Sequence, residues 1–237
     1  MSAPRLHLEQ RLAEGRTAIV EGDRAHYLRN VLRLRAGGEV RPFNARDGEW
    51  SARIVMVARH RVDLQIEHRS RAPADEPGPV LAFAPIRRNR LDWLVEKAVE
   101  LGAAGLVPVL SSRTVVRPES SGRLSAIVTE AVEQCERLTL PSLNDPIPLD
   151  LWLGTREQAR ALVFADERAQ EGSLLAACRS HKSVDILIGP EGGFTAEERE
   201  RVLQVPGVAR VSLGPLILRA ETAALAALAG WRLAQER

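Results

Sequence analysis

The segment Ile186-Leu-Ile-Gly-Pro-Glu-Gly-Gly-Phe-Thr-Ala-Glu-Glu198 joins a short apolar run to a glycine-rich loop and then to a helix start. The apolar run at 186–188 is typical of a buried strand in a parallel sheet, because such a strand is covered on both faces. Thr195, followed three residues later by Glu198, forms a capping box and predicts that a helix begins there. A strand, a short loop and a helix in this order indicate an α/β domain.

The same alternation of strands and helices extends over residues 80–237. Apolar runs predict strands at 80–84, 106–110, 162–165, 186–188 and 208–213. Apolar stripes at helical spacing predict helices around 91–101, 124–138 and 221–233. In the second of these helices, Glu130, Gln134 and Arg137 are expected to share the polar face. We therefore predict an α/β domain with a mostly parallel sheet.

Residues 1–72 show a different periodicity. Val62, Leu64 and Ile66 alternate with polar residues, which is the pattern of a strand with one face in water. Further strands are expected at 17–20, 39–43 and 53–57, and Asp23 is expected to cap a short helix through 26–33. Several short strands with one helix predict a small β-barrel. The segment 73–79 holds three prolines and a glycine, so it is expected to be a linker.

The composition excludes a disordered tail protein, a collagen-like fibre and a small protein held together by disulfides. With 237 residues, of which 45% are hydrophobic and 27% charged, the chain is typical of a globular protein with one or two domains. The two cysteines, Cys135 and Cys178, form no CxxC motif, so we expect a reducing compartment and no metal site. Neither end carries an apolar stretch long enough to span a bilayer, so we expect a cytoplasmic protein without membrane contact.

Charge is unevenly distributed along the chain. Residues 1–72 hold 14 arginines against nine acidic residues, a net charge of +5, whereas residues 73–237 have a net charge of −3. A basic first part indicates docking of a polyanion. Arginine-rich usage throughout the chain is the alternative explanation, because only Lys97 and Lys182 are lysines.

Polar residues and glycines follow three of the predicted strands, at 165–167, 189–194 and 213–222. Ligands of parallel α/β sheets bind beyond the carboxyl ends of the strands, so these loops are the candidate site. The glycine-rich loop lacks the Gly-Lys-Ser/Thr of a P-loop, and no two glycines are two residues apart, which excludes the Gly-x-Gly fingerprints. It is either a turn that lets the backbone approach a ligand or a plain connection between strand and helix.

The third loop brings Arg219, Glu221 and Thr222 to the start of the last helix. A guanidinium, a carboxylate and a hydroxyl at one helix entrance can bind a polar ligand. Alternatively, Glu221 only complements the helix dipole and Arg219 is a solvated surface charge.

Taken in order, these motifs resemble the RsmE family of 16S rRNA uridine-N3 methyltransferases, which belong to the SPOUT superfamily of trefoil-knotted enzymes. The resemblance covers nearly the whole chain. The segments that carry it are His26-Tyr-Leu-Arg-Asn-Val-Leu-Arg33, Glu96-Lys-Ala-Val-Glu-Leu-Gly102, Ser112-Arg-Thr114, Glu130-Ala-Val-Glu-Gln-Cys-Glu-Arg-Leu-Thr-Leu-Pro141, Gly189-Pro-Glu-Gly-Gly-Phe194 and Leu213-Gly-Pro-Leu-Ile-Leu-Arg-Ala-Glu-Thr-Ala223. Ala220 departs from the family pattern, because a hydroxyl residue is expected at that position.

The resemblance implies a PUA-like β-barrel that docks RNA at 1–72, a linker at 73–79, and a knotted SPOUT methyltransferase domain at 80–237, in a homodimer. It implies transfer of a methyl group from S-adenosylmethionine to N3 of a uridine in 16S rRNA of the small ribosomal subunit, uridine 1498 in rRNA numbering. Two alternatives stay open. One is a SPOUT methyltransferase acting on another RNA, and the other is a non-catalytic RNA-binding protein of ribosome assembly.

The resemblance also implies roles for individual residues. Arg219 is expected to stabilise the deprotonated uracil, Glu221 to orient Arg219 or accept the proton, and Thr222 to bind the base. Cofactor contacts are expected from Phe164, Ala165, Gly189, Pro190, Gly192, Leu213, Gly214 and Leu218. RNA contacts are expected from Arg5, His26, Arg29, Arg33, Arg87, Lys97, Arg113 and Arg137. For Lys97 and Arg137, internal ion pairs or the dimer contact are alternative roles.

Overall fold

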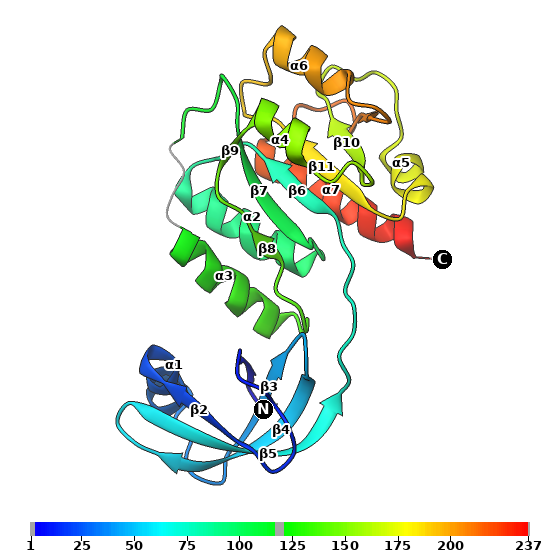
Figure 1. Ribbon diagram of the computed structural model, residues 1–237. Coiled ribbons are helices and arrows are strands. Elements are labelled where there is room, and N and C mark those ends of the chain that lie inside the picture. Colours follow the sequence, from blue (N-terminus) through cyan, green and yellow to red (C-terminus); the bar gives the residue numbers. More distant parts are fainter. Residues whose placement is uncertain (1–2, 117–120, 237) are drawn as a thin grey trace. The chain divides into compact units, whose positions relative to one another are not determined.

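The computed structural model describes residues 3–116 and 121–236. The chain divides into two compact units (Figure 1). The first unit comprises Met1–Glu76 and Val132–Leu140, and the second comprises Pro77–Ala131 and Pro141–Arg237.

The first unit is built on a curled, five-stranded sheet (Figure 1). Its strands are β1 (Arg5–His7), β2 (Thr17–Glu21), β3 (Glu39–Asn44), β4 (Gly48–Val57) and β5 (Arg61–Arg71), in the order β1-β3-β4-β5-β2. The predicted alternation along β5 is confirmed, because Val62, Leu64 and Ile66 all point into the core. Sequence reasoning did not find β1, which pairs in parallel with β3 over only three residues.

One helical segment accompanies this sheet. The α-helix α1 (Gly22–His26) continues directly into a π-helical turn, η1 (Tyr27–Val31). Asp23 was expected to cap the helix, and that expectation is wrong. The helix begins at Gly22 with Glu21 at the N-cap, two residues earlier than expected, so Asp23 lies in the first turn, where a carboxylate interacts favourably with the helix dipole.

The second unit contains a parallel sheet of seven strands. They are β6 (Val80–Phe83), β7 (Gly105–Leu110), β8 (Ser142–Leu143), β9 (Ile147–Pro148), β10 (Ala161–Ala165), β11 (Val184–Ile188) and β12 (Ala209–Val211). The order is β12-β10-β11-β6-β7-β8, with β9 also paired to β7. The predicted α/β class and the parallel sheet are therefore confirmed. The trefoil knot implied by the family resemblance stays a prediction.

Helices cover both faces of this sheet (Figure 1). On one face lie α2 (Arg88–Glu100), α5 (Leu174–Ser180) and α7 (Ala220–Gln235), and on the other lie α4 (Leu149–Thr155) and α6 (Ala196–Leu203). The capping box at the start of α6 is confirmed, since the Thr195 hydroxyl accepts from the Glu198 amide at 3.2 Å and the Glu198 carboxylate accepts from the Thr195 amide at 2.9 Å. Neither α4 nor α5 was predicted.

The helix α3 (Ser121–Gln134) is shorter than the apolar stripe at 124–138 predicted. Glu136 has a φ of 61°, a left-handed conformation that no helix can continue through. Arg137 therefore lies beyond the helix, and its expected place on a polar face with Glu130 and Gln134 is wrong. Within the described residues, no helix is long and apolar enough to cross a membrane.

Candidate cofactor and RNA site

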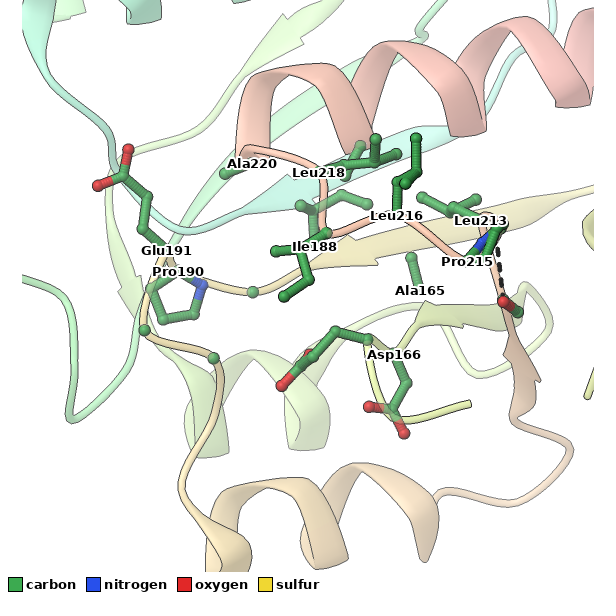
Figure 2. A pocket seen from close by; sticks show the side chains of 18 residues that line it. Ala165, Asp166, Ile188, Pro190, Glu191, Leu213, Pro215, Leu216, Leu218 and Ala220 are labelled. Atoms are coloured by element: carbon green, nitrogen blue, oxygen red, sulfur yellow. Dashed lines mark hydrogen bonds between the residues drawn. The ribbon is translucent and has the colours of Figure 1, made fainter. Parts of the chain in front are cut away.

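The three loops singled out from the sequence converge on one cavity of the second unit (Figure 2). Because β12, β10 and β11 are neighbouring parallel strands, their carboxyl ends bring the loops 165–167, 188–193 and 212–218 together. Ala220 and Ala223, from the first turn of α7, complete the lining. The cavity has a volume of about 320 Å³.

Most of the expected cofactor contacts line this cavity. They are Ala165, Gly189, Pro190, Gly192, Leu213, Gly214 and Leu218. Phe164 does not belong to the lining. Its side chain is buried beneath the loops and packs against the Phe194 ring, with 5.8 Å between the ring centroids.

The glycine-rich loop has a shape that depends on Gly193. Its φ is +67°, and a Cβ at this position would lie 2.6 Å from Oε1 of Glu167 in the first loop. The Gly193 amide donates to the Pro190 carbonyl at 2.8 Å and closes the turn. The left-handed backbone conformation therefore favours glycine at position 193, whereas the Glu167 side chain, which is flexible at its end, could move away from a Cβ.

The candidate catalytic residues lie at the entrance of α7 but differ in surroundings. Arg219 is the N-cap residue and is exposed; it follows the lining residue Leu218 but does not itself line the cavity, and its side chain has no hydrogen bond or ion pair within the described residues. Thr222 is also exposed. Glu221 is 7% exposed, and it does not line the cavity.

Glu221 was expected to orient Arg219 or to accept the proton, and its nearest cationic partner in the structure is a different arginine. Its Oε1 lies 3.5 Å from Nε of Arg90, a residue in the first turn of α2 that sequence reasoning missed. Its Oε2 is buried with no hydrogen-bond partner within the described residues. Glu221 therefore keeps one acceptor that no other group of the described chain uses.

Asp166 is a further lining residue, and no role was predicted for it from the sequence. Its buried carboxylate accepts hydrogen bonds at 2.7 Å from both Arg199 and Arg210, and at 3.0 Å from the Arg168 amide. Burial alone would raise the pKa of Asp166, but the hydrogen bonds from Arg199, the Arg168 amide and Arg210 outweigh it, so the pKa lies below the ordinary value. The lining residue Asp166 thus pairs with two guanidinium groups that do not themselves line the cavity.

The expected RNA contacts fall into two groups. His26, Arg33 and Arg87 are exposed, and Arg29 is partly exposed with one donor 3.4 Å from the Arg59 carbonyl. The others are held by protein groups. Lys97 bridges Glu96 and Glu100 at 2.7 and 2.8 Å, and the Arg137 side chain is largely buried with Nε 3.5 Å from Glu76.

Arg5 and Arg113 also have protein partners. Arg113 is exposed but donates from Nη1 to the Gly192 carbonyl at 2.7 Å. Arg5 is buried in an ion pair with Glu49, so it is not accessible to RNA, and we withdraw it from the expected contacts. Within the described residues, no group of three or more His, Cys, Asp or Glu side chains is placed to hold a metal ion.

Comparison with known proteins agrees with this geometry. Residues 76–232 match the family model described as an RNA methyltransferase domain, and residues 20–67 match the RNA methyltransferase PUA domain. The chain is 32% identical to ribosomal RNA small subunit methyltransferase E of Rickettsia conorii, over 98% of this chain and 96% of the relative. It is 28% identical to the Bacillus subtilis protein of the same name, over 93% and 91% of the two chains.

Solved structures show the same similarity over both units. A ribosomal RNA small subunit methyltransferase E from Neisseria gonorrhoeae, bound to S-adenosylmethionine, has a TM-score of 0.85 at 30% identity and covers 96% of each chain. A methyltransferase structure from Legionella pneumophila with the same bound cofactor has a TM-score of 0.86 at 26% identity, covering 99% of this chain and 98% of the other. The family resemblance of the sequence motifs is confirmed: this chain belongs to the ribosomal RNA small subunit methyltransferase E family.

Proposed function

We propose that this chain transfers a methyl group from S-adenosylmethionine to N3 of a uridine in 16S rRNA of the small ribosomal subunit, uridine 1498 in rRNA numbering. One observation carries the proposal. Three loops that are far apart in sequence form a single cavity, and its lining residues Leu218 and Ala220 are the sequence neighbours of Arg219, whose exposed side chain has no hydrogen bond or ion pair within the described residues. The relative from Neisseria gonorrhoeae, described with S-adenosylmethionine bound, supports the choice of cofactor.

The residues around the cavity suit such a cofactor. A volume of about 320 Å³ is sufficient for a small molecule, and Ile188, Leu213 and Leu218 supply apolar walls for an adenine ring. The glycines at 189, 192 and 193 leave backbone groups open to a ligand's polar atoms. When bound, the cofactor supplies a methyl group on a positively charged sulfur, which is already electrophilic.

The reaction requires the N3 proton of uracil to be removed. Arg219 favours the deprotonated base, because a guanidinium stabilises the negative charge that spreads over its two carbonyl oxygens. Glu221 is our candidate for the proton acceptor, and its unpartnered Oε2 supports this assignment. The exposed Thr222 hydroxyl is the candidate for a hydrogen bond to the base.

We assign RNA docking to residues 1–72, through His26, Arg29 and Arg33, and methyl transfer to residues 80–237, with 73–79 as the linker. The net charge of +5 in the first segment supports this division. The third loop exposes Leu216 at 77% and Ile217 at 95%, which supports a homodimer that covers them. A protein that acts on the small ribosomal subunit is expected in the cytoplasm.

The test is methyl transfer from labelled S-adenosylmethionine to small subunits that lack the modification, to naked 16S rRNA and to tRNA, with the product base identified. We expect N3-methyluridine at one position of the small subunit and little label in tRNA. Methylation of another atom or another RNA would contradict the substrate. No transfer at all, with no cofactor binding by calorimetry, would favour the non-catalytic RNA-binding protein.

A further inference from the structure

Two guanidinium groups hold the glycine-rich loop from outside the cavity. Arg113 donates from Nη1 to the Gly192 carbonyl at 2.7 Å, and Arg90 donates from Nη1 to the Glu191 carboxylate at 2.6 Å. Neither arginine lines the cavity, although both contact the loop that forms one of its walls. Their contacts fall on adjacent residues, so they fix the tip of the loop at two points.

Arg113 is itself anchored to the helix that follows the loop. The amide of its neighbour Ser112 donates to Oε1 of Glu198 at 2.6 Å. The other oxygen of this buried carboxylate accepts from the Thr195 amide at 2.9 Å, at the start of α6. The turn that carries Arg113 and the end of the glycine-rich loop are therefore fastened to the same carboxylate.

Arg90 connects two walls of the cavity. Besides its contact with Glu191, its Nε lies 3.5 Å from Oε1 of Glu221, in the first turn of α7. That turn directly follows the third loop and contributes Ala220 to the lining. The planar guanidinium serves two carboxylates at once, which a lysine ammonium on a flexible stem does poorly.

We propose that Arg90 and Arg113 form an arginine clamp that holds the glycine-rich loop in the shape required for cofactor binding. Three of the six residues at 189–194 are glycines, so ordering a free loop would cost considerable conformational entropy on binding. Because the two arginines already order the loop in the free protein, cofactor binding does not have to. Arg113 is accordingly a positioning residue for the cofactor, in place of the RNA contact expected from the sequence. The inference rests on the proposed use of S-adenosylmethionine.

The first experiment is calorimetric measurement of S-adenosylmethionine affinity, without RNA, for Arg90→Ala, Arg113→Ala and the double variant. Each single variant is expected to bind roughly five- to tenfold more weakly, which is the net effect of one ordinary hydrogen bond. At saturating cofactor, kcat of Arg113→Ala is expected to stay within about twofold, because the clamp acts before the chemical step. Arg90→Ala is judged by cofactor affinity alone, since Arg90 also pairs with Glu221. The control is Arg201→Ala. It removes an exposed ion pair, 2.7 Å long, between Arg201 on α6 and Asp150 on α4, and is expected to bind S-adenosylmethionine like the wild type.

Conservative variants separate this role from a merely structural one. Arg113→Lys keeps one donor for the Gly192 carbonyl, so it is expected to restore most of the affinity. Arg90→Lys cannot serve Glu191 and Glu221 together, so it is expected to stay weakened. Equal rescue by both lysines, or a loss of RNA affinity alone in Arg113→Ala, would overturn the proposal.

A ligand-free measurement keeps the clamp testable even if the cofactor assignment fails. Hydrogen exchange of the amides at 189–194 is expected to accelerate in both alanine variants and to stay unchanged in Arg201→Ala. Unchanged exchange in the alanine variants would overturn the clamp. If the variants show this exchange pattern but the wild-type protein binds no S-adenosylmethionine, the clamp stands and the proposed function is refuted.

Discussion

Arg5 in the first unit and Arg219 in the second are both arginines for which the sequence predicted a ligand contact, and their surroundings are opposite. The Arg5 side chain is 2% exposed, with Nε 2.6 Å from an equally buried Glu49. Its remaining donors reach main-chain carbonyls at the end of α3 and just beyond it, at 2.7–3.1 Å, those of Val132, Glu133 and Arg137. Arg219, in contrast, is exposed beside the lining residue Leu218, and its side chain has no partner within the described residues.

The difference shows what a charge count leaves out. Arg5 contributes to the net charge of +5 that indicated a polyanion, yet its charge is neutralised inside the fold. The groups that accept hydrogen bonds from Arg5 lie 44 to 132 residues away in the sequence. Long-range contacts thus decide which arginines stabilise the fold and which remain exposed to bind a ligand. The following variants test this distinction and the packing of the cavity wall.

The largest effect is expected for Arg5→Met. The substitution leaves the buried Glu49 carboxylate and several carbonyls without their donor, and breaking a buried ion pair costs about 3–5 kcal/mol. Denaturant unfolding should show this loss, while the folded protein keeps its cofactor affinity. Arg46→Met is the control, because it removes a solvent-exposed ion pair with Asp47. Equal stability of the two variants would contradict the structural role of Arg5.

Arg219→Ala is expected to have the opposite signature. Removal of one charge-stabilising donor from a reaction site costs about 2.7–4 kcal/mol of transition-state stabilisation, a rate loss of 100- to 1,000-fold. The unfolding free energy should change by less than about 0.5 kcal/mol, because no contact is lost. Methyl-transfer rates measured beside unfolding curves check both. A wild-type rate would remove Arg219 from the reaction.

Asp166→Asn tests a residue that is buried like Glu49 but lines the cavity. We expect the free energy of unfolding to fall by about 1–3 kcal/mol at neutral pH, since Arg199 and Arg210 lose their charged partner. The pKa of Asp166 is lowered in the folded state, so its contribution is present above the pKa of an unfolded aspartate and is lost as the pH falls through the folded-state value. Unfolding curves of the variant should therefore vary less with pH below about 4. If the unfolding free energies of the wild type and of Asp166→Asn fall equally as the pH is lowered, the ionised state of Asp166 does not stabilise the fold.

Gly193→Ala tests how tightly the cavity wall is built. The left-handed φ of +67° costs an alanine about 1–2 kcal/mol, and the new Cβ meets Glu167. Gly207→Ala is a matched control, because Gly207 has a φ of +70° with nothing within 4 Å. Both variants should lose similar stability, and only Gly193→Ala should lose cofactor affinity. Unchanged cofactor affinity in Gly193→Ala would contradict a role for the left-handed turn at Gly193 in shaping the cavity wall.

The smallest effect is expected for Arg33→Ala in the first unit. Loss of one phosphate contact should reduce the slope of log affinity against log salt by about 0.7–0.9. RNA titrations at several salt concentrations measure this slope. Arg5→Met, studied where it is folded, should leave the slope unchanged. A reduced slope for Arg5→Met would show that the two groups of arginines are wrongly divided.

Local signals were sufficient for much of the fold. The capping box at Thr195 predicted the start of α6 because both partners lie within three residues. The loops of the cavity were predicted because parallel strands end at one edge of a sheet. Strands such as β8 and β9, with two residues each, are too short to show any period, and they were missed.

The details of the site depended on contacts that no local pattern reveals. Arg90 meets Glu191 across 101 residues, and Arg113 meets Gly192 across 79. Sequence reasoning consequently missed Arg90 and gave Arg113 an RNA role. Glu221 was correctly placed at the entrance of the last helix, but its partner is Arg90 and not the nearby Arg219. Motifs thus located the site, whereas packing decided which charges are free within it.

The most direct test is a crystal structure of this chain with S-adenosylmethionine. We expect the cofactor in the cavity between the loops 165–167, 188–193 and 212–218, with its methyl group facing the side on which Arg219 is exposed. A cofactor bound elsewhere on the second unit, or a cavity closed by the loops in the complex, would contradict the assignment of these three loops as the site of methyl transfer.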